Sequence, residues 1–260
     1  MSQSKRGTYA WYELLTTDTA GATAFYKSVV GWDIAVWNPG PPPYHMLKAG
    51  EAGVGGLMEL PEQARAMGAP PHWIAYIEVD DVDAAAGQIE KLGGRVLVPP
   101  MDVPNIGRWC TAADPHGAVF SAFKSANPDG MAPPSGVGTF CWAELMTPDT
   151  DGAWDFYAAL FGWDKTESME MGPAGTYQMF GAAGRKASLG GMMHKPAEIP
   201  GPAVWNYYIV VDDLTRALGA TTAGGGQILT GPMQIPGGAW VAIAMDPQGA
   251  AFALLSETKS

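Results

Sequence analysis

Short apolar runs typical of strands alternate along the chain with segments in which apolar residues recur at the spacing of a helix. Residues 11–17, WYELLTT, form a short apolar run that predicts a strand, and Asp18 behind it can cap a helix by accepting hydrogen bonds from its first free amides. Apolar residues then recur at helical spacing, at Ala22, Phe25, Val29 and Val30. Gly31 follows them and ends the predicted helix. The pattern predicts a strand followed by a capped amphipathic helix.

Short apolar segments follow this helix, and the strand–helix step then recurs. The segments YHMLKA at 44–49 and GVGGLME at 53–59 predict strands. WIAYIEV at 73–79 predicts another strand, and 80–94 a second helix closed by glycine. The segment 108–123 contains Asp-Pro-His-Gly, which fits a type I turn and predicts a hairpin. This half of the chain therefore predicts two successive βαβββ units.

The whole pattern occurs twice. Residues 7–33 recur in similar form at 138–164, with Gly, Thr, Trp, Glu, Asp, Phe and Tyr at matching places, and DPHGAVFSAF at 114–123 matches DPQGAAFALL at 246–255. A period of about 132 residues is too long for a solenoid repeat, so it predicts a duplicated domain. The stretch between the copies is rich in Pro, Gly and Ser, which is typical of a linker. The predicted boundaries are 7–125 for the first domain, 126–136 for the linker and 137–256 for the second domain.

The order of these motifs resembles the vicinal oxygen chelate superfamily, which contains glyoxalases, bleomycin-resistance proteins and extradiol dioxygenases. The resemblance is carried by the DT..A..FY…GW helix entry, the EVDDVDAA strand-to-helix step, the GG behind it and the DP.G hairpin. More narrowly, the chain is similar to tandem glyoxalase-like proteins of actinobacteria, some of them called hydroxylases of antibiotic pathways. We expect an α+β fold of two tandem glyoxalase-like domains, each a pair of βαβββ units forming curved mixed sheets with helices outside.

The founding chemistry of this family uses a divalent metal held by His and Glu side chains in the cup of the sheet. The resemblance places the three ligand positions at Trp11, Ile74 and Ser121 in the first half, and at Trp142, Asn206 and Ala253 in the second. Indole and alkyl groups offer no lone pair to a hard cation, and a single amide or hydroxyl is a poor ligand. We therefore expect neither a metal ion nor another cofactor.

The histidines do not replace this set, because none of them recurs in the other half. They are His45, His72, His116 and His194. A metal site in one half alone stays open as an alternative, and a surface or edge position is the favoured interpretation for each histidine.

Residues two apart on a strand face the same way, so Glu13 accompanies Trp11 and Glu144 accompanies Trp142. The same alternation on the other strands predicts which further side chains face the cup of each sheet. The predicted ligand-binding residues are Trp11, Met58, Ile74, Tyr76, Ser121, Phe123, Trp142, Met193, Asn206, Tyr208 and Leu255. Apolar walls with a few polar groups are typical of small-molecule pockets, although Trp and Met at such positions also fit a plain core.

Glu13 and Glu144 admit two interpretations. An inward carboxylate is costly to bury unpaired, and a raised pKa would suit a general acid or base. Alternatively, a carboxylate kept in both copies accepts hydrogen bonds from a Trp N–H or a backbone amide and fixes one strand to the next. Arg108 likewise fits either an anion-holding residue at the cup rim or a solvated hairpin arginine.

Composition narrows the choice of partners and compartment. The formal net charge of −11 over 260 residues disfavours nucleic acid and anionic membranes. The polar start MSQSKRG does not predict a signal peptide, and no apolar segment approaches the ~20 residues of a membrane span. Cys110 and Cys141 occupy non-equivalent positions, which predicts two buried free thiols in a reducing cytoplasm. The oligomeric state, monomer or homodimer, stays open.

Three functions are weighed here, and a fourth, a non-enzymatic interaction protein, stays open because a fold does not specify a function. The first is metal-independent binding of a small, partly aromatic molecule, for sequestration or presentation in secondary metabolism. The second is a tailoring enzyme, hydroxylase-associated, lyase or isomerase, that uses Glu13 or Glu144 as acid or base. The third, a metal-dependent lyase or dioxygenase, is disfavoured by the residues at the ligand positions.

Overall fold

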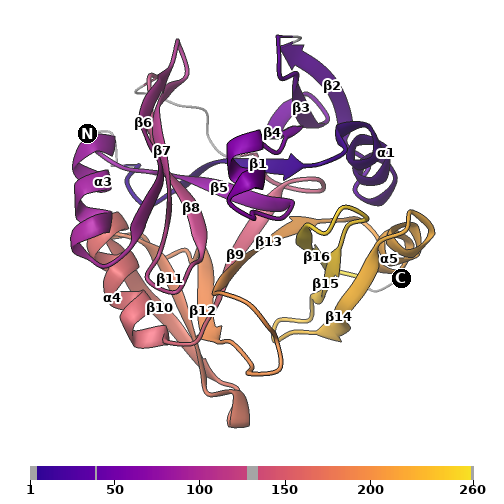
Figure 1. Ribbon diagram of the computed structural model, residues 1–260. Coiled ribbons are helices and arrows are strands. Elements are labelled where there is room, and N and C mark those ends of the chain that lie inside the picture. The colour runs from indigo at the N-terminus through magenta and orange to yellow at the C-terminus, as the bar shows by residue number, and fades with distance from the viewer. Residues whose placement is uncertain (1–4, 39, 128–133, 259–260) are drawn as a thin grey trace. The chain divides into compact units, whose positions relative to one another are not determined.

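The structure, a computed structural model, describes residues 5–38, 40–127 and 134–258 (Figure 1), so residues 128–133 of the predicted linker lie outside the described residues. The first repeat contains β1 (Tyr9–Thr16), α1 (Thr19–Val29), β2 (Asp33–Asn38), β3 (Tyr44–Ala49), β4 (Ala52–Glu59), α2 (Glu62–Ala66), β5 (His72–Glu78), α3 (Val82–Lys91), β6 (Arg95–Val103), β7 (Gly107–Ala113) and β8 (Val119–Ser125). The second contains β9 (Phe140–Thr147), α4 (Thr150–Phe161), β10 (Trp163–Glu170), η1 (Gly172–Ala174), β11 (Thr176–Ala182), β12 (Gly190–His194), β13 (Val204–Val210), α5 (Leu214–Ala223), β14 (Gln227–Gln234), β15 (Trp240–Met245) and β16 (Ala251–Ser256).

Each repeat forms one eight-stranded mixed sheet, with the same strand order in both. The order is β2-β3-β4-β1-β5-β8-β7-β6 in the first and β10-β11-β12-β9-β13-β16-β15-β14 in the second. In the first sheet β1 pairs with β4, and β5 with β8, in parallel, while the pairs β2–β3, β3–β4, β6–β7 and β7–β8 are antiparallel. The predicted α+β fold with two βαβββ units per repeat is confirmed.

The predicted helix ends are confirmed as well. The Asp18 carboxylate accepts a hydrogen bond from the Gly21 amide at 2.9 Å at the start of α1. Asp149 caps α4 in the same way. Gly162 ends α4 with φ 68°, a left-handed conformation that a residue with a Cβ adopts at a cost. The sequence pattern therefore fixes where both helices begin and where α4 ends.

The chain divides into two compact units that differ from the two repeats. Of the described residues, unit 1 contains 5–10, 75–127 and 142–205, and unit 2 contains 11–38, 40–74, 134–141 and 206–258. Each unit therefore combines one βαβββ module of the first repeat with one of the second. In unit 1 α3 contacts α4, and in unit 2 α1 contacts α5.

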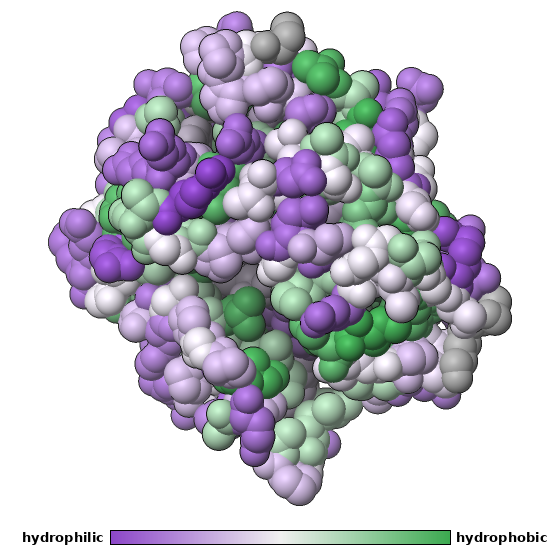
Figure 2. Space-filling view, turned by 45° about the vertical axis from the view of Figure 1, so that its right-hand side comes forward, coloured by the Kyte–Doolittle hydropathy of each residue, from purple (hydrophilic) through white to green (hydrophobic). Residues whose placement is uncertain are grey.

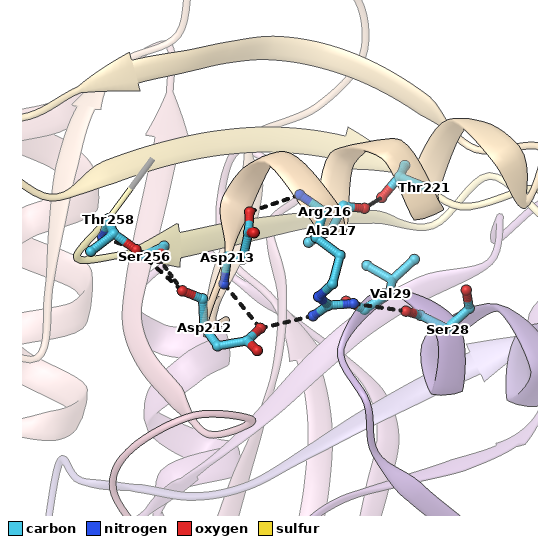
Figure 3. Close-up of polar contacts among 9 residues, drawn as sticks. All are labelled: Ser28, Val29, Asp212, Asp213, Arg216, Ala217, Thr221, Ser256 and Thr258. Atoms are coloured by element: carbon cyan, nitrogen blue, oxygen red, sulfur yellow. Dashed lines mark hydrogen bonds and ion pairs between the residues drawn. The ribbon is translucent and has the colours of Figure 1, made fainter. Parts of the chain in front are cut away.

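In unit 2 an arginine joins the two helices (Figure 3). Arg216 of α5 donates to the carbonyls of Ser28 and Val29 at the end of α1, at 3.2 and 3.5 Å, and pairs with Asp212 at 2.9 Å. A helix leaves its last carbonyls without internal partners, so this guanidinium satisfies groups that the α1 sequence cannot satisfy itself.

A buried tyrosine connects the modules inside each unit. In unit 2 Tyr26 of α1 donates to the Asp246 carboxylate at 3.1 Å and accepts a hydrogen bond from Trp73 Nε1 at 2.9 Å. The same three groups recur in unit 1 as Tyr157, Asp114 and Trp205. Burial raises the pKa of both aspartates, and the hydrogen bonds that they accept oppose this shift. The FY and DP.G motifs of the sequence thus build the core.

Two further indoles bind the opening glycine of the other repeat. Trp32 Nε1 donates to the Gly138 carbonyl, and Trp163 Nε1 to the Gly7 carbonyl, each at 2.7 Å. Both glycines have positive φ, and a Cβ on either would lie within 2.8 Å of a neighbouring atom. The close approach explains why each repeat opens with glycine.

The surface corrects one prediction. Both cysteines are free, but only Cys110 is buried; Cys141, near the start of β9, is exposed, and its Sγ donates to the Tyr208 carbonyl at 3.6 Å. Hydrophilic residues cover much of the face in Figure 2, with hydrophobic patches between them. Among the described residues no helix is long and apolar enough to span a membrane.

Candidate functional site

One face of β1 in unit 2 carries the predicted Trp–Glu pair. Strand pairing places Glu13 opposite Gly56 of β4, and Met58 of β4 opposite Tyr44 of β3. Paired residues project to the same side of a sheet, so Trp11, Glu13, Tyr44 and Met58 share this face.

The Tyr44 hydroxyl links the indole to the carboxylate. Trp11 Nε1 donates to it at 2.8 Å, and the hydroxyl in turn hydrogen-bonds the Glu13 carboxylate. Burial, followed by the negative charge of Glu13, raises the pKa of Tyr44 far above its usual value, so the phenol keeps its proton. We call this arrangement the Trp–Tyr–Glu chain. It holds the half-buried indole in one orientation.

Unit 1 contains a second Trp–Tyr–Glu chain with the same geometry. Trp142 Nε1 of β9 donates to the Tyr177 hydroxyl of β11 at 2.8 Å, and Tyr177 hydrogen-bonds Glu144. The two carboxylates are 7% and 8% exposed, for Glu13 and Glu144 respectively. Both glutamates also make contacts outside the Trp–Tyr–Glu chain. The glutamates accept a tyrosine hydroxyl, whereas the structural alternative drawn from the sequence named a Trp N–H or a backbone amide as donor.

A glycine makes room for each tyrosine. A Cβ on Gly56 would overlap the Tyr44 hydroxyl, and a Cβ on Gly191 would overlap the Tyr177 ring. Sequence reasoning missed both tyrosines as members of the site. The signal was present, because the tyrosines and the Gly-Gly pairs of β4 and β12 recur in both repeats together with Trp and Glu.

A second predicted face lies on β5, β7 and β8 of the first repeat. In unit 1 Tyr76 pairs with Ser121, and Phe123 pairs with Trp109, an aromatic residue that the sequence analysis did not select. The Tyr76 ring centroid lies 5.9 Å from that of Trp109 and 6.2 Å from that of Phe123. The buried Ser121 hydroxyl hydrogen-bonds Thr111 at 2.9 Å. The predicted residue Ile74 precedes them on β5 and is buried.

The corresponding face of the second repeat is less aromatic. In unit 2 Tyr208 of β13 pairs with Ala253 of β16, and Leu255 pairs with Val241 of β15. Asn206, two residues before Tyr208, is 2% exposed. The remaining predicted residue, Met193 of β12, is half-buried in unit 1.

Arg108 is engaged by carboxylates at the surface of unit 1. It makes two hydrogen bonds of 2.8 Å to Asp83 and pairs with Asp102 at 3.0 Å. The guanidinium lowers the pKa of Asp83. The carboxylates of Asp83 and Asp102 therefore occupy the hydrogen-bonding edge of the Arg108 guanidinium.

The residues at the family's metal positions do not fit a divalent cation. The Trp11 and Trp142 nitrogens are donors already in use, and the Ser121 hydroxyl is bonded to Thr111. Within the described ranges, no three His, Cys, Asp or Glu side chains come close enough together to hold a metal ion.

The histidines lie apart from these faces or bond locally. His45 and His72 hydrogen-bond the backbone carbonyls of Leu57 and Pro70 at 3.3 and 2.7 Å. His116 Nε2 lies 3.6 Å from the Asp149 carboxylate, and His194 is exposed.

These features define a class: a tandem α+β protein with two eight-stranded mixed sheets, each carrying a Trp–Tyr–Glu chain. A family model described as the Glyoxalase/Bleomycin resistance protein/Dioxygenase superfamily matches residues 8–121 and 139–254. The chain belongs to this superfamily, as the resemblance in the sequence predicted.

Similar proteins cover almost the whole chain. The "Putative glyoxylase CFP32" of Mycobacterium bovis is 35% identical over 260 residues, which is 98% of this chain and 96% of the relative. The "Anthracycline biosynthesis protein DauV" of Streptomyces sp. (strain C5) is 27% identical and is covered to 95%, against 98% of this chain. The Mn(II)-bound glyoxalase from Novosphingobium aromaticivorans shares the fold, with a TM-score of 0.64 at 18% identity, over 98% of this chain and 83% of its own.

Proposed function

We propose that the protein binds a small, partly aromatic molecule without a metal ion, and sequesters or presents it in secondary metabolism. The main support is the Trp–Tyr–Glu chain. At the position where the family places a metal ligand, each repeat has an indole held by a hydrogen bond and left partly accessible. A preoriented aromatic ring loses little conformational freedom on stacking against a flat ligand.

The names of relatives support the same ligand class. An anthracycline biosynthesis protein of similar length suggests a fused-ring aromatic compound as ligand here. The net charge of −11 argues against nucleic acid as a partner, and the two free thiols fit a reducing cytoplasm.

Titration of intrinsic tryptophan fluorescence with a panel of aromatic polyketides tests this function. We expect saturable quenching that is unchanged after dialysis against EDTA, because no step of binding uses a metal ion. Trp11→Leu and Trp142→Leu should weaken binding, whereas Trp154→Leu, which removes a half-buried indole of α4 that belongs to neither Trp–Tyr–Glu chain, should not. Absence of quenching by every compound up to about 1 mM would contradict aromatic binding. Quenching that disappears with EDTA and returns with a divalent cation would contradict metal independence.

A second candidate function is proton transfer by Glu13 or Glu144 in a tailoring reaction. The observation in its favour is a largely buried carboxylate with a neutral tyrosine as hydrogen-bond donor, since a positioned carboxyl group is suited to acid–base catalysis. If a bound polyketide is converted, Glu13→Gln or Glu144→Gln should stop turnover without changing binding or the circular dichroism spectrum. Conversion at the normal rate by both variants would exclude this role.

A further inference from the structure

Asn206 of β13 holds a buried polar group that the chain leaves without a partner. The residue is 2% exposed, and its side-chain nitrogen makes no hydrogen bond to any residue that the structure describes. A buried amide that forms no hydrogen bond is costly, so an acceptor from outside the chain is the natural compensation.

The apolar face around this amide argues for a ligand as that acceptor. Tyr207 packs edge-on against Tyr12 with ring centroids 5.4 Å apart, so its neighbour Asn206 projects to the other side of β13. Strand register places the following side chains on the Asn206 side: Tyr208, Val241, Ile243, Ala253 and Leu255. A buried water forms about three hydrogen bonds, and apart from the Tyr208 hydroxyl these side chains supply none of them.

The first repeat is built differently at the same place. Ile74 occupies the position of Asn206, and the pair Trp109 and Phe123 occupies that of Val241 and Leu255. In the first repeat the Ser121 hydroxyl hydrogen-bonds Thr111. Of these two faces, the second carries the fully buried side-chain donor that forms no hydrogen bond to the described residues.

Two other buried atoms, Thr23 Oγ1 and Gln248 Oε1, form no hydrogen bond to the described residues either, but they belong to half-buried residues on α1 and in the turn before β16, off the sheet faces. Tyr9 is half-buried at the first position of β1 and makes other contacts, including one with the Trp163 ring at 6.2 Å between centroids. Asn206 therefore stands apart by its burial and by its apolar surroundings.

We propose that the Asn206 amide donates a hydrogen bond to a carbonyl oxygen of a ligand bound against the β13 face, so that the second repeat selects fused-ring ketones or quinones. The inference rests on the proposed binding function and adds the chemical group that is recognised. The first repeat, with Ile74 at this position, makes no such selection.

A matched ligand pair tests the inference on the full-length protein. Anthraquinone-2-sulfonate and anthracene-2-sulfonate share a flat three-ring frame, but only the first carries ring carbonyls. We expect the wild type to bind the anthraquinone about tenfold more tightly in a fluorescence titration. Asn206→Leu should abolish this preference by weakening anthraquinone binding about tenfold relative to anthracene binding. Ile74→Leu, the matched change in the first repeat, should keep the preference.

The outcomes separate this inference from the function on which it rests. Equal binding of both compounds by the wild type, or a preference that survives in Asn206→Leu, overturns the role of Asn206 and leaves aromatic binding standing. If neither compound binds, the inference fails, and the polyketide panel decides separately whether the aromatic-binding function stands. Asn206→Val, which also removes the donor, should lose the preference as well and serves if the leucine variant does not fold.

Thermal unfolding without ligand gives an independent reading. Asn206→Leu should raise the melting temperature, because it removes a buried donor that has no partner and adds apolar contact. A lower melting temperature of the folded variant would show that the amide is satisfied within the chain, and would overturn the inference.

Discussion

At the scale of single residues, a tyrosine hydroxyl between an indole and a carboxylate has both of its hydrogen-bonding roles fixed. Tyr44 accepts from Trp11 and bonds Glu13, so each contact orients the other. Such a linked group is more sensitive to substitution than a tyrosine with one partner.

Removing the tyrosine hydroxyl tests whether the Trp–Tyr–Glu chain stabilises the fold. Tyr44→Phe and Tyr177→Phe should each lower the free energy of unfolding by about 1–3 kcal/mol, because a buried N–H loses its acceptor and a carboxylate loses a donor. Urea denaturation measures the change. Glu13→Gln, which keeps an acceptor for the hydroxyl, is the matched control and should cost less. Phenylalanine variants as stable as the wild type would show that the chain contributes nothing to stability.

The raised pKa of both tyrosines predicts how stability depends on alkaline pH. Above the unfolded pKa of about 10, the unfolded state releases these protons while the folded state keeps them, so stability falls as pH rises. The contribution is complete below pH 10 and is lost by about 1.4 kcal/mol per pH unit for each tyrosine above it.

Denaturation series between pH 9 and 11.5 measure this slope. Each Tyr→Phe substitution at 44 or 177 should make the decline shallower by one proton. An unchanged slope in both variants would mean that the two phenols ionise freely in the folded protein.

At the scale of secondary-structure elements, the pairing of β3 with β4, and of β11 with β12, depends on a glycine that leaves room for the tyrosine of the neighbouring strand. Gly56→Ala and Gly191→Ala should each cost about 1–3 kcal/mol, because the new methyl group overlaps a tyrosine that cannot move without breaking its hydrogen bonds. Thermal unfolding measures both effects. Gly87→Ala, in α3 where a Cβ meets no atom within 4 Å, should instead gain about 0.5–1 kcal/mol. Similar shifts in melting temperature for all three Gly→Ala variants would show that the glycine–tyrosine contacts do not affect stability.

The elements were the most predictable part of the structure. Caps and periods are local signals, so Asp18, Asp149 and Gly162 could be placed from their neighbours alone. The side-chain alternation also gave the shared face of Trp11 and Glu13. Tyr44 could not be assigned as their partner, because that contact depends on the register between three strands, which no local pattern specifies.

At the scale of the whole molecule, the duplication was evident in the sequence, but the composition of the compact units was not. Tyr26 and Asp246 are separated by 220 positions, and no periodic signal connects them. Which module packs against which is decided by buried aromatic contacts such as that between Tyr12 and Phe140, whose rings stack with centroids 3.9 Å apart.

Division of the chain tests this arrangement. Residues 1–127 and 128–260, expressed together as separate polypeptides, should co-purify and keep the far-ultraviolet spectrum of the intact protein, because each unit needs a module from both. Either fragment alone should aggregate or self-associate, since it exposes aromatic residues that the other fragment normally covers. Two stable monomeric fragments with no affinity for each other would contradict the unit composition.

The shared construction of the units also limits what gene duplication could have done for this chain. A second copy usually offers redundancy, so that one may accumulate changes by drift while the other preserves the original. Here Trp32 and Trp163 each bind the opening residue of the opposite copy, so neither copy can change these residues independently of the other. The copies differ instead at positions that take no part in these contacts, such as Ile74 of β5 and Asn206 of β13.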